Sequence, residues 1–265
     1  MAISSKDAKA AVVLAAGKGT RMKSDLPKVA AILAGRPLLS HVIDHLVEAG
    51  IRRIVFIVGY QQDVVRKLVA DHIAASGLSD EIQVQFAEQT EQLGTGHAFL
   101  CAADSLSDYS GPILVASGDQ PMIQSGSFRE LLETHSNGGH GLSLLTTRME
   151  DPTGYGRIMR DADGQVERNV EEKDASDEIR KVQEVNIGTY VFTGPEIFSL
   201  LRKIGSNNAQ GEYYLPDALV LNREAGHTIG TVTLTDATEA QGVNSPVELK
   251  FLEEKLKLSQ SSGLA

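Results

Sequence analysis

Residues 12–22 read Val12-Val13-Leu14-Ala15-Ala16-Gly17-Lys18-Gly19-Thr20-Arg21-Met22, and Pro27-Lys28 follows shortly after. The apolar run predicts a buried strand, and the two glycines can adopt backbone angles that are closed to other residues. Their amides can therefore approach a ligand closely, while Lys18, Arg21 and Lys28 bring positive charge beside them. This combination indicates phosphate binding and would suit a triphosphate.

Two well-known phosphate-binding loops do not fit this segment. A nucleotide P-loop needs Gly-x-x-x-x-Gly-Lys-Ser/Thr, and the dinucleotide fingerprint needs Gly-x-Gly-x-x-Gly. Here Met22 takes the place of the third glycine, and Lys18 lies inside the turn instead of opening the following helix. Taken alone, the segment could also be a strand-ending turn with surface lysines.

The composition indicates a soluble globular chain that can bury one large core. The chain has 265 residues, 42% of them hydrophobic, with a net charge of −10 and one cysteine. It has no cluster of Lys and Arg for nucleic-acid binding, and Cys101 can form no internal disulfide and is expected in the core. No apolar stretch could cross a bilayer, and residues 1–10 lead into no signal-peptide core. We therefore expect a cytoplasmic protein with no nucleic-acid partner and no membrane insertion.

Strand-like and helix-like runs alternate along the first half of the chain. Apolar runs predict parallel strands that are buried on both faces, and amphipathic stretches predict the helices between them. The strands are expected at 10–16, 54–58 and 113–116, and the helices at 37–49, 61–75 and 96–103. This alternation predicts the α/β class, with a Rossmann-like, doubly wound, mostly parallel sheet that binds ligands at the carboxyl ends of its strands.

From about Leu142 the pattern changes to short strands and turns. Strands are expected at 142–147, 156–160, 166–170 and 185–192, which we interpret as an inserted antiparallel β region. Helical patterns return at 195–203, 213–225 and 246–257, with a strand at 228–234.

A second chemical signal is Ser117-Gly118-Asp119, directly after the strand expected at 113–116. A carboxylate at a strand end points into the ligand crevice, and magnesium needs only one or two protein oxygens beside water and substrate phosphates. Asp119 is therefore a candidate Mg²⁺ ligand. The alternative is that Asp119 caps the helix beginning near Ser125 or stabilises a turn.

A third signal is the segment from Gln89 to His97, after a strand expected at 82–87. A glutamine amide offers both a donor and an acceptor, which match the edge of uracil or thymine, and Gly94 and Gly96 would let the backbone approach a base. The structural alternative is a helix start capped by Thr95, and both interpretations are compatible. His97 is expected to be a packed or surface residue.

Five motifs together make the chain resemble the sugar-1-phosphate nucleotidyltransferases. The nearest branch is the N-terminal uridylyltransferase domain of the bifunctional bacterial N-acetylglucosamine-1-phosphate uridylyltransferases that also carry glucosamine-1-phosphate acetyltransferase. The resemblance covers about 10–244, and its motifs lie at 14–22 with 27–28, at 91–97, at 151–157, at 170–174 and at 208–214.

The resemblance implies a UDP-N-acetylglucosamine diphosphorylase that uses Mg²⁺, UTP and N-acetylglucosamine 1-phosphate and serves cell-wall peptidoglycan synthesis. It implies catalytic roles for Lys18, Arg21 and Lys28, and Mg²⁺ ligands at Asp119 and Asn244. The implied nucleotide-binding residues are Leu14, Ala15, Ala16, Gly17, Gly19, Gln89, Gln92, Gly94 and Thr95. The implied sugar-binding residues are Gly118, Gly156, Glu171 and Asn186, although Glu171 could be a solvated charge and Asn186 a turn residue.

Two residues near the expected sugar site depart from the family pattern. Ser117 stands where the family often has a larger residue, commonly Tyr, and Ile187 stands where Thr or Ser is usual. Another sugar 1-phosphate, such as glucose 1-phosphate, and a thymidylyltransferase therefore remain alternatives. A third alternative is a non-catalytic nucleotide-sugar sensor.

The domain boundaries follow from the same resemblance. We expect a nucleotidyltransferase domain at 1–245, with a nucleotide-binding half at about 10–140 and a sugar-binding half at about 141–245, followed by a C-terminal helix and tail at 246–265. The chain has no hexapeptide repeat. We therefore expect neither acetyltransferase activity nor a trimer built on a β-helix.

Overall fold

The computed structural model describes the backbone of residues 9–262 and the side chains of residues 9–258. The ends of the expected domains, at 1–8 and 263–265, lie outside the described residues, as does most of the segment searched for a leader peptide. No helix within the described part has both the length and the apolar character needed to cross a bilayer.

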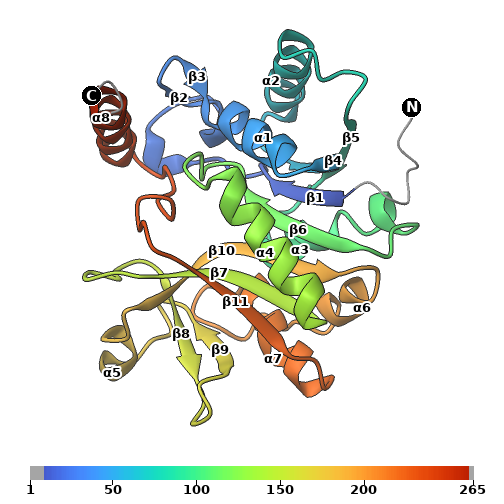
Figure 1. Cartoon of the computed structure of the whole chain (residues 1–265), viewed down its shortest axis with the longest axis vertical. Helices are drawn as coiled ribbons and strands as arrows, with labels where there is room; N and C mark the ends of the chain where they lie inside the picture. Colours follow the sequence, from blue (N-terminus) through green and yellow to red (C-terminus); the bar gives the residue numbers. More distant parts are fainter. Residues whose placement is uncertain (1–8, 263–265) are drawn as a thin grey trace.

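A mixed β-sheet forms the centre of the molecule (Figure 1). Its strands follow the order β11-β7-β10-β6-β1-β4-β5, and only β10 runs antiparallel to its neighbours. The α/β fold with a mostly parallel sheet is thereby confirmed. The strands are β1 (Lys9–Leu14), β4 (Ile51–Val58), β5 (Gln83–Glu88), β6 (Pro112–Ser117), β7 (Leu142–Arg148), β10 (Glu184–Thr193) and β11 (Ile229–Leu234).

The antiparallel region is only partly separate from this sheet. Its two outer strands, β7 and β10, lie within the central sheet, and β11 returns parallel to β7. Only the hairpin of β8 (Gly156–Arg160) and β9 (Val166–Val170) branches away, held to β10 by pairing at Val185 and Asn186. We call this hairpin the arm.

Helices cover both faces of the sheet, as a doubly wound fold requires. In β1, Ala11 and Val13 face one core while Ala10 and Val12 face the other, because successive side chains of a strand point to opposite faces. The first core is completed by α1 (Leu38–Glu48), α2 (Gln62–Ala75) and α4 (Ser125–Gly138), and the second by α3 (Thr95–Leu100), α6 (Ile197–Leu201) and α7 (Ala218–Glu224). Short elements are α5 (Asp177–Arg180), β2 (Ile32–Leu33), β3 (Arg36–Pro37) and the 3₁₀ turns η1 (Thr20–Met22), η2 (Lys28–Ala30), η3 (Asp104–Leu106) and η4 (Leu215–Asp217).

The C-terminal helix α8 (Pro246–Ser262) packs beside the glycine turn rather than on the sheet. Its Leu252 is fully buried against Met22 of η1 and Val243. Met22, which replaces a glycine of the dinucleotide fingerprint, is therefore an apolar anchor for the turn. Cys101 is half-buried against the second core, as a free thiol.

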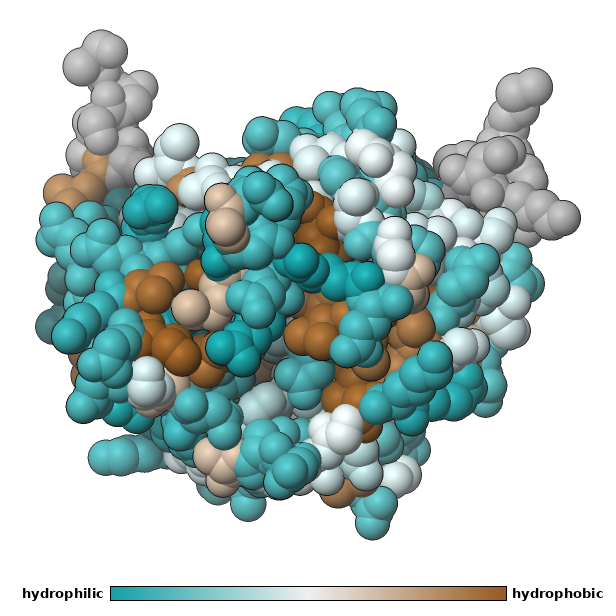
Figure 2. Space-filling model, turned by 90° about the horizontal axis from the view of Figure 1, so that it is seen from below, coloured by the Kyte–Doolittle hydropathy of each residue, from teal (hydrophilic) through white to brown (hydrophobic). Residues whose placement is uncertain are grey.

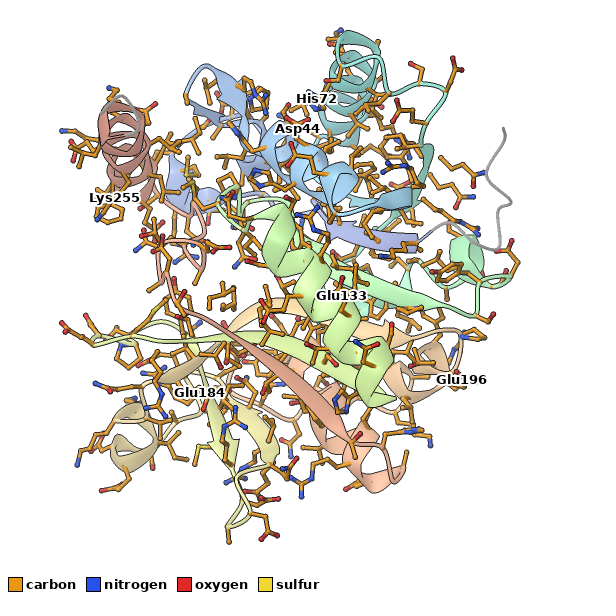
Figure 3. All side chains as sticks on the ribbon, in the orientation of Figure 1. Asp44, His72, Glu133, Glu184, Glu196 and Lys255 are labelled. Carbon is orange, nitrogen blue, oxygen red and sulfur yellow. The ribbon has the colours of Figure 1, made fainter. Side chains whose placement is uncertain are left out.

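A polar contact also joins two helices on one face of the sheet. His72 of α2 lies 2.7 Å from Asp44 of α1, so the two helices on one face are also joined by a polar contact (Figure 3). On the face shown in Figure 2, apolar residues form separate patches within a mostly hydrophilic surface.

His135 of α4 is a buried polar residue of the central sheet region. It is 3% exposed, and its ring nitrogens lie 3.1 Å from the hydroxyl groups of Ser143 and Thr193. Burial lowers the pKa of His135 from 6.5 to about 4, and nearby His140 acts in the same direction. The unfolded chain thus binds a proton at a higher pH than the folded chain, so stability is lost as the pH falls from 6.5 toward 4.

We predict that His135→Gln weakens this pH dependence. The wild-type free energy of unfolding should fall by about 2 kcal/mol more than that of the variant between about pH 7 and about pH 5. Urea unfolding at both pH values measures the difference. His227→Gln, at an exposed position, should keep the wild-type dependence. An equal loss in His135→Gln and wild type would contradict the assignment.

Candidate active site

Three adjoining hollows lie along the carboxyl ends of β1, β5 and β6, with volumes of about 290, 250 and 740 Å³. The strand-end hollow contains most of the expected nucleotide-binding residues, the arm hollow contains most of the expected sugar-binding residues, and the loop hollow contains the three expected cations. The strand-end hollow, of about 290 Å³, is lined by Leu14–Gly17, Gln89, Gln92, Gly94, Thr95 and Asp119. The arm hollow, of about 250 Å³, is lined by Tyr155, Gly156, Glu171, Asn186, Ile187 and Tyr214. The loop hollow, of about 740 Å³, is lined by Gly17–Arg21, Lys28, Lys173 and Asn244.

The expected metal ligands and cations meet where the strand-end and loop hollows join. The Lys28 ammonium group forms an ion pair with Asp119 and donates a hydrogen bond of 2.9 Å to Asn244 Oδ1. Arg21 donates a second hydrogen bond of 3.0 Å to the same oxygen. The Lys28 and Asp119 side chains are only 20% and 14% exposed. Residues more than 200 positions apart in the sequence thus form one cluster, which we call the cation cluster.

Gly19 makes the approach of Lys28 possible. Its φ of +65° lies in the left-handed region, and a Cβ atom there would lie only 2.6 Å from the Cβ atom of Lys28. The Lys18 ammonium lies over the Tyr60 ring, 5.2 Å from its centre. Lys18 and Lys28 thus both line the loop hollow, but only Lys28 contacts Asp119 and Asn244.

The oxygens of the cation cluster suit a hard divalent cation. Asp119 and the Asn244 amide both contact the same ammonium nitrogen, so their oxygens converge on one point. Within the described chain, no group of three or more His, Cys, Asp and Glu side chains is placed to hold a metal ion. A metal with few protein ligands, completed by water and substrate phosphates, is the kind that this pair fits. The alternative role of Asp119 as a helix cap is wrong, since Gln124 occupies the N-cap position of α4.

Gln89 and Gln92 both line the strand-end hollow. Gln89 is 6% exposed, and its amide nitrogen donates to the Gly94 carbonyl at 3.1 Å and lies 3.2 Å from His97 Nδ1. Gln92 donates to the Ala16 carbonyl at 2.8 Å. This bond ties the loop to the end of β1, and the Gln89 oxygen has no hydrogen-bond partner among the described residues.

Gly94 and Thr95 also hold a second segment against this loop. The Tyr213 amide donates to the Leu93 carbonyl at 2.8 Å, the Gly96 amide donates to the Tyr213 carbonyl at 2.8 Å, and the Leu215 amide donates to Thr95 Oγ1 at 3.1 Å. A Cβ atom on Gly94 would lie 2.7 Å from the Tyr213 oxygen, and its φ is +110°. The N-cap of α3 is Gly94, so the expectation that Thr95 caps this helix is wrong.

The arm hollow is lined by the half-buried carboxylate of Glu171 and the buried amide of Asn186. Glu171 accepts a 2.7 Å hydrogen bond from Asn169. Burial raises the pKa of Glu171; the Asn169 bond opposes this shift, and the nearby carboxylates of Asp174 and Asp217 add to it. Glu171 is therefore not a solvated surface charge. Asn186 is 8% exposed within β10 and donates to the Tyr190 hydroxyl at 2.6 Å, so it is not a simple turn residue.

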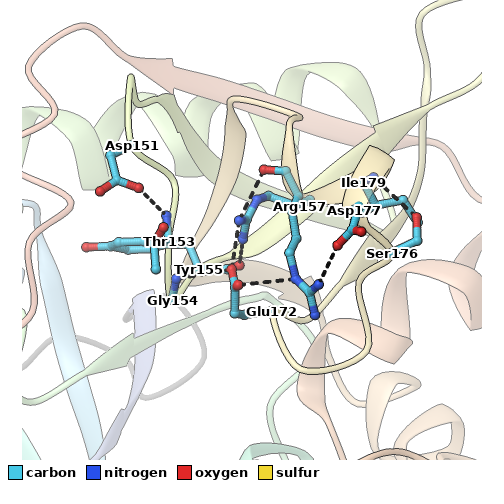
Figure 4. A network of polar contacts seen from close by, with 10 residues as sticks. Asp151, Thr153, Gly154, Tyr155, Arg157, Glu172, Ser176, Asp177 and Ile179 are labelled. Atoms are coloured by element: carbon cyan, nitrogen blue, oxygen red, sulfur yellow. Dashed lines mark hydrogen bonds and ion pairs between the residues drawn. The ribbon is translucent and has the colours of Figure 1, made fainter.

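A buried arginine holds the rim of the arm hollow (Figure 4). Arg157 is 1% exposed, pairs with Glu172 at 2.7 Å and donates to the Tyr155 carbonyl. Glu172 also accepts from the Gly154 amide at 3.2 Å. The Arg157 hydrogen bond lowers the pKa of Glu172, which stays charged in this network. The segment that carries Tyr155 and Gly156 is thus fixed by charged contacts.

Not every expected residue lines the cleft, and several lining residues, Glu212 among them, were given no role from the sequence. Gly118 is not among the residues that line these hollows; its amide donates to the Leu14 carbonyl at 3.0 Å and joins the ends of β1 and β6. Glu212 lines all three hollows, and its half-buried carboxylate has no partner among the described residues. Glu212 belongs to the family motif at 208–214, but no pattern in the sequence indicated a role for its side chain.

Comparisons with known proteins show the family to which the chain belongs. Residues 10–236 match the family described as nucleotidyl transferase. The chain is 44% identical over 247 residues to "Bifunctional protein GlmU" of Oceanobacillus iheyensis, covering 93% of this chain and 52% of that protein. It is 45% identical over 240 residues to the protein of the same name from Geobacter metallireducens, covering 91% and 48%. The chain spans about half the length of the curated relatives it matches.

Among solved structures, the fold resembles that of a UDP-glucose pyrophosphorylase crystallised with UDP-glucose. The TM-score is 0.75 at 17% identity, and the match covers 95% of this chain and 99% of the other. At this identity the likeness establishes the fold alone.

We predict that Gly94→Ala destabilises the protein, because the new Cβ atom meets the Tyr213 backbone at a strained φ. The free energy of unfolding should fall by about 2 kcal/mol or more. Gly17→Ala is the matched control, because a Cβ atom added there would have no other atom within 4 Å and the φ of Gly17 is not positive. Denaturant unfolding should show a change under about 1 kcal/mol for Gly17→Ala. Equal stability of the two variants would contradict the inference that the close packing of Gly94 against Tyr213 stabilises the fold.

Proposed function

Because the chain belongs to the nucleotidyl transferase family, we propose that it is a uridylyltransferase that makes UDP-N-acetylglucosamine and pyrophosphate from UTP and N-acetylglucosamine 1-phosphate. The cation cluster is the observation that carries this proposal. It brings Arg21 and Lys28 together with Asp119 and Asn244 where the strand-end hollow joins the loop hollow, which Glu171 also lines.

The proposed reaction needs no protein nucleophile. An oxygen of the sugar phosphate forms a bond to the α-phosphorus of UTP, the bond from that phosphorus to the bridging oxygen breaks, and pyrophosphate leaves with the electron pair. Such a transfer is limited by bringing anions together in line and by stabilising charge. Lys18, Arg21 and Lys28 would bind the phosphates and offset the charge that develops on pyrophosphate.

Asp119 and Asn244 are the proposed Mg²⁺ ligands. When bound, Mg²⁺ would neutralise and orient the reacting phosphates. Lys28, which contacts both ligands, would then turn toward the phosphates beside them. The convergence of the two oxygens on one cation supports this assignment.

Recognition of uracil is assigned to the loop after β5. The amide nitrogen of Gln89 is directed to Gly94, so its oxygen is the group left to accept a hydrogen bond from the N3–H of uracil. Gln92, Gly94 and Thr95 line the same hollow. Leu14, Ala15 and Ala16 would contact the nucleoside from the strand end.

Recognition of the sugar is assigned to Gly156, Glu171 and Asn186 in the arm hollow. Glu171 would accept hydrogen bonds from sugar hydroxyl groups. Ser117 lines this hollow and leaves room where a larger side chain is common in the family. Ile187 is 4% exposed and belongs to the first core, so its side chain is largely committed to packing.

Asp119→Asn should abolish most of the turnover. The variant keeps the size of the side chain and removes the charge that faces the cation, so kcat should fall about 100-fold or more. Pyrophosphate release with UTP, N-acetylglucosamine 1-phosphate and Mg²⁺ measures the loss. Asp163→Asn, at the exposed turn of the arm, is the control and should keep wild-type kcat. A kcat for Asp119→Asn near that of wild type would remove Asp119 from the metal site.

A substrate panel tests the proposed specificity. With UTP, we expect kcat/KM for N-acetylglucosamine 1-phosphate to exceed that for glucose 1-phosphate about 10-fold or more, and UTP to be preferred to TTP. Preference for glucose 1-phosphate would support the alternative substrate and make Ser117 and Ile187 candidate specificity determinants. No turnover with any sugar would support the sensor and contradict the proposed enzyme.

A further inference from the structure

Gln120 connects the proposed metal-binding turn to the strand behind the sugar-binding wall. It follows Asp119 directly, is 8% exposed, and donates a buried hydrogen bond of 2.6 Å from Nε2 to the Ile187 carbonyl. The residues that it joins are 67 positions apart in the sequence. This bond holds the two segments in register.

The Ile187 carbonyl lies in an irregular part of β10. The pairing of β10 with β7 shifts register between Asn186 and Tyr190, and Gly188 has a φ of +84°. The Gly188 amide bonds to Asn186 Oδ1 at 3.0 Å instead of to a neighbouring strand. A bulge of this kind removes backbone groups from the ladder and redirects side chains. Gln120 therefore supplies the hydrogen bond that the ladder does not give to Ile187.

The same turn also holds the segment that carries Asn244. The Asp119 carbonyl accepts a 2.9 Å hydrogen bond from the Val243 amide, while the Asp119 carboxylate pairs with Lys28. Asp119 and Gln120 together thus join both proposed metal ligands to the bulge that carries Asn186. A shift of β10 relative to the turn at Asp119 and Gln120 would therefore strain these contacts.

The carbonyl oxygen of the Gln120 side chain helps to define the contribution of this residue. Its Oε1 is buried without a hydrogen-bond partner among the described residues. A buried unpaired oxygen is destabilising, so an apolar side chain of similar size would avoid that cost. The contribution of Gln120 is therefore its N–H donor to Ile187 rather than general packing.

We propose that Gln120 is a positioning residue that fixes the Asn186–Gly188 bulge relative to Asp119 and so aligns the sugar phosphate with the nucleotide. This inference rests on the proposed uridylyltransferase function. It assigns Gln120 to the sugar side of the site, with little influence on the nucleotide side.

The test compares Gln120→Met with wild type, because methionine has a similar volume and no donor. Gln124→Met is the matched control, since Gln124 makes an equivalent amide-to-carbonyl bond of 2.7 Å to Met122 but is exposed. Two readouts are measured: the KM values for UTP and for N-acetylglucosamine 1-phosphate, and amide hydrogen exchange of the peptide covering 185–190. The second readout does not depend on activity.

We expect Gln120→Met to raise the KM for the sugar phosphate about 5-fold to 10-fold, as the loss of one hydrogen bond predicts, with the KM for UTP within about 2-fold of wild type. Hydrogen exchange at 185–190 should be faster by a similar factor, while Gln124→Met matches wild type in both readouts.

Unchanged exchange and KM values would overturn the inference. Equal increases in both KM values together with a lower thermal midpoint would also overturn it, because a purely structural role predicts that pattern. If wild-type protein showed no turnover with any sugar phosphate, the proposed function would fail. Hydrogen exchange alone would then decide whether Gln120 fixes the bulge.

Discussion

The ammonium group of Lys28 joins three parts of the chain that are far apart in sequence. It contacts Asp119 after β6 and Asn244 before α8, and its own side chain packs against Gly19 of the glycine turn. The Lys28 and Asp119 side chains are only 20% and 14% exposed, so removal of one partner would leave the other charge poorly compensated. The cation cluster thus holds the glycine turn, the turn after β6 and the segment before α8 together by side-chain contacts. The chain has one cysteine, so no internal disulfide can join them.

Local pattern predicted most elements, and the errors have identifiable causes. The arm strands β8 and β9 were predicted with their observed bounds, because short alternating runs flank a clear turn at Asp163-Gly164. The strand expected to reach Ala16 ends at Leu14, where the Ala16 carbonyl bonds to Tyr60 and Gln92 instead of to a strand. The helix expected from Tyr213 begins only at Ala218, after a 3₁₀ turn that contains Pro216. The position of β7 and β10 within the central sheet was not predictable, since strand partners are not a local property.

The site shows the same division. The glycine turn, Asp119 and the glutamine loop were indicated by their own residue types at strand ends, and Asn244 was indicated only by the family resemblance. Gln120 could not be assigned a role, because its partner Ile187 lies 67 positions away in the sequence. Glu212 could not be assigned one either, because the hollow that it shares with Leu14 and Gln89 is formed only in the folded chain. Gly94 shows the limit of inference from residue type: its small size admits the Tyr213 backbone as well as any base. The loop at 93–96 and the segment at 213–215 are therefore held together as one unit.

The first turn of α8 gives the cleft a remote support. The Glu248 carboxylate accepts hydrogen bonds from the backbone N–H of Asn244 at 2.6 Å and from the Ser245 hydroxyl at 3.1 Å. This arrangement resembles a capping box. Leu252, one turn further on, is buried against Met22 below the glycine turn. The same helix thus holds the backbone of Asn244 at one end and supports the glycine turn from its side. The cation cluster therefore depends on a helix none of whose described side chains lines the three hollows.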